Sequence, residues 1–154
     1  MRLPTASLLV LAASAIVAGC GLLPGLDPPS SGSLVTVETR GGHCRVGPCA
    51  GTMAIGRDGR VHATAPDDAE LGRLPEELRR GLEQAVRVAD FERIGSRPFT
   101  GECPVNFDGQ EQVYTFTTPS GPVRLASCEV EIDPSDPLFA AVQAALDAVP
   151  PPGG

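Results

Sequence analysis

The spacing of apolar residues changes period along this chain, and that change constrains the fold more than any other feature. Five segments alternate apolar and polar residues, as half-buried β-strands do. They are residues 34–39, 52–57, 60–64, 111–118 and 122–132. Residues 74–95 and 136–149 instead place apolar residues three and four positions apart, as on one side of a helix. The predicted order of elements is therefore β-β-β-α-β-β-α.

Turn residues connect the predicted strands into hairpins. Asp58-Gly59 lies between two alternating runs and is typical of a two-residue hairpin turn. Residues 119–122 provide turn chemistry between the last two runs. Helices with one apolar face can bury it against a sheet of antiparallel hairpins, which gives an α+β fold with a single core. We therefore expect an antiparallel sheet of about five strands with two helices packed on one face, formed by residues 34–149.

Start signals mark both predicted helices. Pro75 suits the first position of one helix, and Asp136 followed by Pro137 suits the cap and first position of the other. Glu76–Arg80 and Glu83–Arg87 have the spacing of favourable ion pairs. The predicted buried stripes comprise Leu78, Leu82, Ala85, Val86 and Ala89 in the first helix, and Phe139, Val142, Leu146 and Val149 in the second. Residues 103–109 are expected to add a short edge strand.

The N-terminus has the pattern of an export signal. Arg2 supplies a positive charge, and the small pair Ala18-Gly19 follows an apolar run over residues 8–18. That run covers 11 positions, whereas a helix needs about 20 residues to span a bilayer. The pattern therefore favours a signal peptide over residues 1–19 rather than a transmembrane anchor.

Val17-Ala18-Gly19-Cys20 resembles the lipobox of bacterial lipoproteins. The resemblance implies that Cys20 receives a diacylglyceryl group and becomes the first residue of the mature protein. Two or more acyl chains anchor a protein stably where one does not. Residues 20–33 are rich in Pro, Gly and Ser, and we expect them to form a flexible tether. The alternative is an ordinary secretory signal with an incidental cysteine.

An anchor at Cys20 implies a domain on the extracytoplasmic side of the cell membrane or outer membrane. Export places the remaining cysteines in an oxidising compartment, where disulfides form. They are Cys44, Cys49, Cys103 and Cys128. Four cysteines allow three pairings, and sequence proximity favours Cys44–Cys49 and Cys103–Cys128. The tail, residues 150–154, is expected to be disordered.

Composition excludes several classes of function. The chain has a net charge of −7, with 12 Lys plus Arg residues against 19 Asp plus Glu, and contains no lysine. The absence of lysine excludes Schiff-base chemistry and a phosphate-loop lysine. An acidic chain without a basic cluster is poorly suited to nucleic acid, so we expect no nucleic-acid partner.

Two clusters contain residue types that bind metals. His43 stands beside Cys44 and near Cys49, but a local disulfide is the more favourable interpretation in an oxidising compartment. Asp67, Asp68 and Glu70 are interpreted as loop charge ahead of the helix. The most acidic run, Glu129, Glu131, Asp133 and Asp136, lacks calcium-loop spacing and is interpreted as the solvated face of a strand. We therefore expect no metal and no cofactor.

No catalytic constellation is organised in the sequence. His43 and His62 are the only histidines, and no serine lies in a nucleophile elbow. The leading hypothesis is a non-catalytic, membrane-anchored binding or structural module with an unidentified envelope protein or ligand as partner. An alternative is an inhibitor of an envelope or extracellular hydrolase, with Arg45, Val46, Gly47 and Pro48 as its interaction loop. A third is an enzyme whose site is assembled only in space.

A second resemblance covers the folded region. Residues 43–61 "HCRVGPCAGTMAIGRDGRV", 82–94 "LEQAVRVADFERI" and 113–123 "VYTFTTPSGPV" resemble small bacterial lipoprotein domains of unknown function. The resemblance extends from Gly42 to Asp147. It implies a small lipoprotein domain and carries no activity to any residue.

Overall fold

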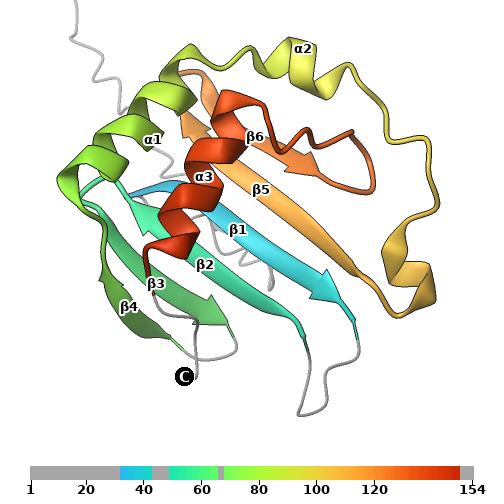
Figure 1. Ribbon diagram of the computed structural model, residues 1–154, viewed down its shortest axis with the longest axis horizontal. Coiled ribbons are helices and arrows are strands. Elements are labelled where there is room, and N and C mark those ends of the chain that lie inside the picture. Colours follow the sequence, from blue (N-terminus) through green and yellow to red (C-terminus); the bar gives the residue numbers. More distant parts are fainter. Residues whose placement is uncertain (1–31, 43–48, 66–67, 150–154) are drawn as a thin grey trace, which may run out of the picture.

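The computed structural model describes residues 32–42, 49–65 and 68–149. These residues form a six-stranded antiparallel sheet with three α-helices (Figure 1). The strands are β1 Ser33–Gly41, β2 Gly51–Gly56, β3 Arg60–Ala65, β4 Ala69–Arg73, β5 Gln110–Thr118 and β6 Gly121–Ala126. The helices are α1 Glu76–Val88, α2 Phe91–Gly95 and α3 Pro137–Asp147, with a 3₁₀ turn, η1, at Pro104–Phe107. The predicted α+β class and antiparallel sheet are confirmed.

Several predictions concern residues outside the described part of the chain. They are the signal peptide 1–19, the lipidated Cys20, His43, Cys44, the loop Arg45–Pro48, Asp67 and the tail 150–154. The predicted tether is described only at Gly32 and Ser33. Ser33 is the first residue of β1 and is 5% exposed, so the ordered domain begins one residue earlier than predicted.

Strand β1 lies at the centre of the sheet. The strand order is β4-β3-β2-β1-β5-β6, so β1 pairs with β2 on one side and β5 on the other. Val35 is opposite Ile55 in β2 and opposite Phe116 in β5. The two sequence-local hairpins, β2–β3 and β5–β6, are therefore joined only through β1.

The helices cover one face of the sheet, which we call the helix face (Figure 1). Val35, Ile55 and Phe116 point into a core that also contains Leu82 of α1 and Val142 of α3. Burial of such side chains stabilises each by about 1.5–3 kcal/mol, and this is the main force that holds the helices on the sheet.

Aromatic rings complete the core beside β5. The Tyr114 ring lies 5.2 Å from Phe139 in an edge-on arrangement, and the Phe116 ring lies 5.4 Å from Phe91 of α2. Edge-on and tilted pairs are favoured by the charge distribution of the rings. Burial raises the pKa of Tyr114, because the phenolate form is poorly solvated there.

The predicted β2–β3 hairpin is confirmed, with a different turn. The connection has three residues, Arg57, Asp58 and Gly59, and only Gly59 has a positive φ, +82°. A three-residue loop that ends in a left-handed residue fits strand twist as well as a two-residue turn does. The Gly59 carbonyl then accepts a hydrogen bond from the Leu74 backbone N–H at 2.8 Å, which fixes the entry to α1.

Strand β4 was not predicted. Its residues, Ala69–Arg73, were interpreted as loop, and the strand adds a sixth member at the sheet edge. Only Leu71 packs against the core. An edge strand with one partly buried apolar side chain carries too little alternation to be detected, and charged residues on such an edge are common.

The predicted helix 74–95 is two helices. α1 ends at Val88, and α2 begins at Phe91 after Asp90, whose side chain accepts a hydrogen bond from the Arg93 backbone N–H. Pro75 is the residue before the first helical position rather than the first position itself. An aspartate cap inside an apolar stripe therefore marks a new start.

The predicted ion pairs of α1 formed in part. Glu76 and Arg80 lie 3.5 Å apart, whereas Glu83 pairs with Arg79 at 2.8 Å instead of with Arg87. Arg79 also binds Glu76 at 2.7 Å, which lowers the pKa of Glu76. Arg79 thus joins two carboxylates on one face of the helix.

The prediction for α3 is confirmed at its start. The Asp136 carboxylate accepts a hydrogen bond from the Leu138 backbone N–H at 3.0 Å, and Pro137 is the first helical residue. Of the predicted stripe, Phe139, Val142 and Val149 are buried and Leu146 is partly buried. Leu138 and Ala145 are also buried. The stripe is wider than predicted because the helix packs on both α1 and the sheet.

Two strand predictions in the C-terminal half are wrong. Residues 103–109 contain the 3₁₀ turn η1 instead of an edge strand, because Pro104 lacks the N–H that a strand ladder needs. β6 ends at Ala126, and residues 127–129 form a turn. Val130 then makes only an isolated bridge with Pro98. The alternation after Ala126 is therefore not a strand pattern.

Candidate functional site

The second face of the sheet carries mainly small and polar side chains together with the buried Val113, and the described helices lie on the other face. Pairing places Thr36 beside Ala54 and Thr115, Ala54 beside His62, and Thr115 beside Arg124. These residues alternate along their strands with Val35, Ile55 and Phe116, which face the helices. We call the second face the open face.

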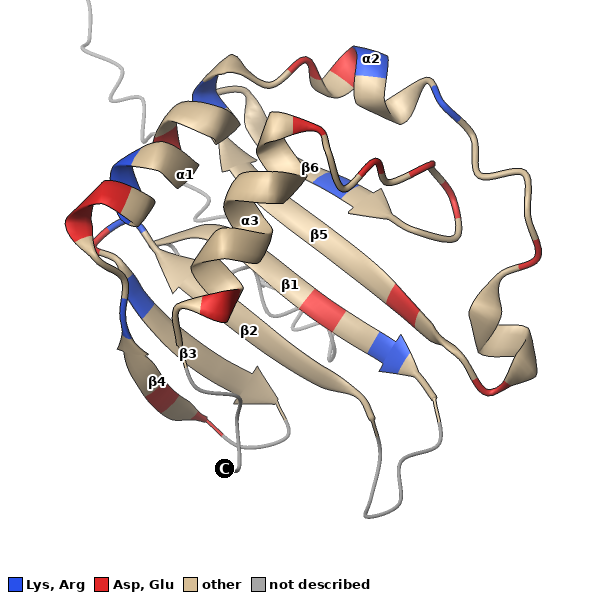
Figure 2. Cartoon of the chain, viewed as in Figure 1, with Lys and Arg blue, Asp and Glu red and all other residues tan. Residues whose placement is uncertain are grey.

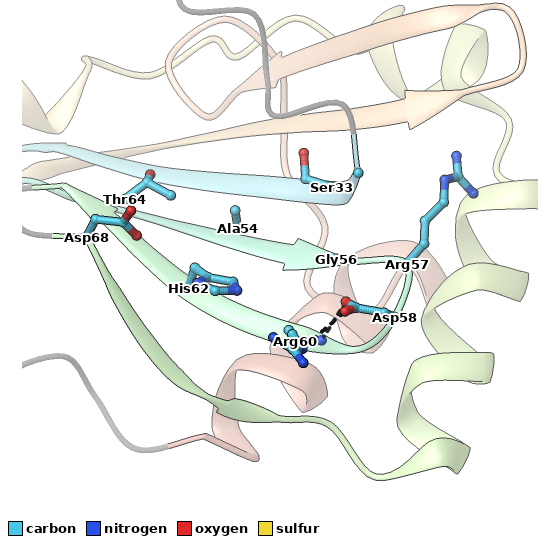
Figure 3. A pocket seen from close by; sticks show the side chains of 10 residues that line it. Ser33, Ala54, Gly56, Arg57, Asp58, Arg60, His62, Thr64 and Asp68 are labelled. Carbon is cyan, nitrogen blue, oxygen red and sulfur yellow. Dashed lines mark hydrogen bonds and ion pairs between the residues drawn. The ribbon is translucent and has the colours of Figure 1, made fainter.

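A hollow of about 600 Å³ lies on the open face beside the β2–β3 hairpin (Figure 3). Small residues of β2 form its floor: Ala54 is 7% exposed, and Gly56 carries no side chain. A Cβ at Gly56 would lie 2.5 Å from the Asp58 Oδ1 atom, so a side chain there would displace the Asp58 carboxylate from its present position. The residues that line the hollow are Gly32, Ser33, Ala54, Gly56, Arg57, Asp58, Arg60, His62, Thr64 and Asp68.

Charged groups at the hairpin end of the hollow hold one another. The Asp58 carboxylate accepts a hydrogen bond from the Arg60 backbone N–H at 3.1 Å, which lowers the pKa of Asp58. The Arg60 side chain lies 3.3 Å from Asp58 and 3.4 Å from Glu70. Arg57 donates to the Thr117 carbonyl at 3.2 Å. The hairpin end is therefore a fixed polar rim.

His62 lies in the middle of the hollow (Figure 3). The hollow brings it together with Thr64 and Asp68, the residue types that the enzyme hypothesis requires. However, no side-chain hydrogen bond joins His62 to another described residue (Figure 3). His62 and Thr64 are also two positions apart on one strand, which separates their Cα atoms by about 6.6 Å. The described residues therefore form an open hollow with a charged rim rather than a linked nucleophile and base.

The favoured pairing of Cys103 with Cys128 is confirmed. The two Cα atoms are 5.1 Å apart and the residues are 25 positions apart in sequence. Cys49 is also disulfide-bonded. Because Cys44 lies outside the described residues, the Cys44–Cys49 pairing stays a prediction. The same holds for any role of the loop Arg45–Pro48.

The acidic run does not converge on one point. Glu129 pairs with Arg124 at 2.8 Å, and Asp133 binds the Ser135 hydroxyl at 2.6 Å, which lowers the pKa of Asp133. Asp136 instead caps α3. No group of three or more His, Cys, Asp or Glu residues within the described ranges could hold a metal ion. The run consists of separate pairs and a helix cap, where the sequence predicted a strand face.

Sequence reasoning missed the floor of the hollow. Ala54 and Gly56 are two positions apart in a strand, so they share one face, and both are small. Two small residues on the outward side of a hairpin strand, with a histidine opposite, are the signal that could have located the hollow. Ser33 was assigned to the tether and so was not considered.

No protein-family model matches the chain, and a search of curated proteins finds no match. Among the described helices, none is long and apolar enough to cross a membrane. Function must therefore be argued from the residues of the domain.

Proposed function

We propose that this chain is a membrane-anchored envelope lipoprotein whose domain is a non-catalytic binding module. The observation that carries the binding role is the hollow on the open face, which has small floor residues and a fixed polar rim. Its volume of about 600 Å³ falls within the range of ligand sites, about 300–1,000 Å³. The lipobox-like Val17–Cys20 supports the anchoring role.

The two roles are connected through the start of β1. Gly32 and Ser33 line the hollow, and Cys20 lies only 12 positions before Gly32 in the sequence. A flexible segment of that length spans about 20 Å between its ends. A lipid on Cys20 would therefore hold the hollow close to the membrane surface, where a ligand of the envelope could reach it.

Fatty-acid labelling tests the anchor. The full chain should incorporate labelled palmitate in bacterial cells and fractionate with membranes, because the acyl chains partition into lipid. Cys20→Ala should lose the label and move to the soluble fraction, whereas Cys49→Ala should keep the label. An unlabelled chain that stays equally membrane-bound when Cys20 is replaced would contradict the anchor.

A pair of substitutions on the open face tests the hollow. Ala54→Leu fills the floor, and Thr115→Leu places the same leucine side chain on the same face outside the hollow. A set of short peptides, small anions and sugars is screened against the full chain by ligand-observed NMR. Binding that Ala54→Leu abolishes and Thr115→Leu retains would support the hollow. The hollow would be contradicted if neither substitution changes binding, or if no compound of the set binds the full chain.

The alternative hypothesis, that the chain inhibits a hydrolase, can be tested separately. Its predicted loop, Arg45–Pro48, lies outside the described residues. Replacement of Arg45 and Val46 by alanine should abolish inhibition of a target hydrolase if that loop enters an active-site cleft. Unchanged inhibition would exclude the loop.

A further inference from the structure

An exposed apolar turn lies at the opposite end of β1 from the hollow. In η1 all four residues are exposed, and the Phe107 and Val105 side chains are 67% and 39% exposed. Among the described residues, the exposed large hydrophobic side chains are Val88, Val105 and Phe107. Single exposed apolar residues are ordinary. Two of them on one four-residue turn, one an aromatic, require a further explanation.

The turn is held rigid from both sides. Cys103, directly before η1, is bonded to Cys128, and the backbone N–H of Gly109, two positions after η1 ends, donates to the Pro104 carbonyl at 2.8 Å. Between them Asp108 adopts a left-handed conformation, φ +58°, which aspartate accepts more readily than most residues other than glycine. A Cβ at Gly109 would lie 2.6 Å from the Pro104 Cβ. A preformed turn loses little conformational entropy when it binds a partner.

Packing leaves Phe107 at the tip. Val105 rests on the end of β1, since a Cβ at Gly41 would lie 3.0 Å from the Val105 Cγ2 atom. The described ring contacts, which join Phe91, Tyr114, Phe116 and Phe139, do not include Phe107. The aromatic ring is therefore presented outward on a supported turn.

Carboxylates flank the exposed ring. Glu102 and Asp108 are both exposed, and neither appears in an ion pair with a described residue. Figure 2 shows acidic positions on both sides of η1. Arg40, at the adjacent end of β1, is held by Glu38 at 2.6 Å. The complementary surface is an apolar pocket with basic residues at its rim. An anionic lipid surface would repel the same carboxylates.

We propose that residues 102–109, the η1 knob, dock a folded partner protein by inserting Phe107 into such a basic-rimmed apolar pocket. Aromatic anchors in desolvated pockets supply most of the affinity of many protein interfaces. The inference goes beyond the proposed function, because neither Cys20 nor the hollow takes part. Over the nine residues of β1, the knob and the hollow are separated by about 26 Å.

Site-specific photocrosslinking in the native host tests the knob with the full chain. A photoreactive residue replaces Asn106 in one variant. In the control it replaces Val88, a large apolar residue that is 64% exposed and lies outside the knob. We expect one discrete protein adduct from position 106 and none from position 88. Adding Phe107→Ala to the first variant should lower the adduct yield at least about 10-fold, while the thermal unfolding midpoint stays unchanged because the ring is exposed.

The purified adduct protein then provides a binding partner for titration. Phe107→Ala should weaken its affinity about 30-fold, the loss typical of an anchor residue. Glu102→Gln with Asp108→Asn should weaken binding less and make it less sensitive to salt, since asparagine tolerates the left-handed conformation. Four results would each overturn the proposal: adducts with lipid only, equal adducts from both positions, no adduct at all, or an adduct yield that Phe107→Ala leaves unchanged.

Discussion

Single residues set the boundaries of the elements, and the sequence identified some of them. Asp136 is recognisable as a helix cap because a short acceptor precedes a proline and an apolar stripe. Asp90 has the same function but stands inside a continuous apolar stripe, so only its hydrogen bond to Arg93 reveals it. Gly59 was correctly placed in a turn. Asp58 does not have the positive φ of a two-residue turn, because the connection has three residues and only Gly59 is left-handed. Caps and turns are therefore predictable where they coincide with a change in pattern.

Replacement of Asp136 by alanine should lower the free energy of unfolding by about 1–2 kcal/mol, because the Leu138 N–H loses its acceptor. The carboxylate also pairs with Arg93 at 2.8 Å. Asp136→Asn keeps the capping oxygen and should cost less than half as much. Urea denaturation of the full chain measures both. Equal losses from the two variants would show that charge, not capping, is the contribution.

Elements with strong local signals were predicted, and those defined by distant contacts were not. The β2–β3 and β5–β6 hairpins follow from alternation and turn residues. β4 forms because its backbone completes the edge of β3, and its own side chains contribute little burial. The hollow exists because Ala54 and Gly56 lie beside larger neighbours on adjacent strands. Its residues were visible in the sequence, but their grouping required the register between strands.

Two glycine substitutions separate turn geometry from helix propensity. Gly59→Ala should destabilise the domain by about 1–2 kcal/mol, because φ is +82° and the new Cβ would lie 3.0 Å from the Arg79 Cδ. Gly81→Ala in α1 has no atom within 4 Å of the new Cβ and should stabilise by about 1 kcal/mol. Chemical denaturation distinguishes them. A neutral Gly59→Ala would contradict the three-residue turn.

At the scale of the molecule, the class was predictable but the strand order was not. The pairing of β1 with β5 joins residues at least 69 positions apart, as in Val35 with Phe116. Alternation predicts that a strand exists and which residues share a face, but it does not specify a distant partner. The confirmed disulfide joins neighbouring cysteines in sequence, so proximity was sufficient there.

Stability should fall in acid through three surface carboxylates. The pKa values of Asp58, Glu76 and Asp133 are lowered in the folded state, chiefly by hydrogen bonds from Arg60, Arg79 and Ser135 respectively. Their unperturbed values are 3.8, 4.5 and 3.8. Depressed folded values stabilise the protein above those unfolded values, and the contribution is lost as pH falls through the folded ones. The urea concentration at the unfolding midpoint should therefore decrease when the pH is lowered below about 4.5. Asp133→Asn should make this decrease smaller. A midpoint independent of pH between 3 and 6 would contradict this.

The Cys103–Cys128 bond should contribute a large share of the domain's stability. It closes a loop of 25 residues, for which the chain-entropy estimate is about 3.5 kcal/mol. Domains of this size have total stabilities of about 5–15 kcal/mol. Cys103→Ser with Cys128→Ser should lower the free energy of unfolding by about that amount. Under oxidising conditions the single variant Cys103→Ser should lose as much, which separates cross-linking from the loss of two sulfur atoms.

Hydrogen exchange in the variant without the disulfide should rise first in residues 103–109, because the bond joins that segment to the turn after β6. Exchange that rises uniformly across the sheet would show that the bond stabilises the whole domain and does not specifically hold the η1 knob.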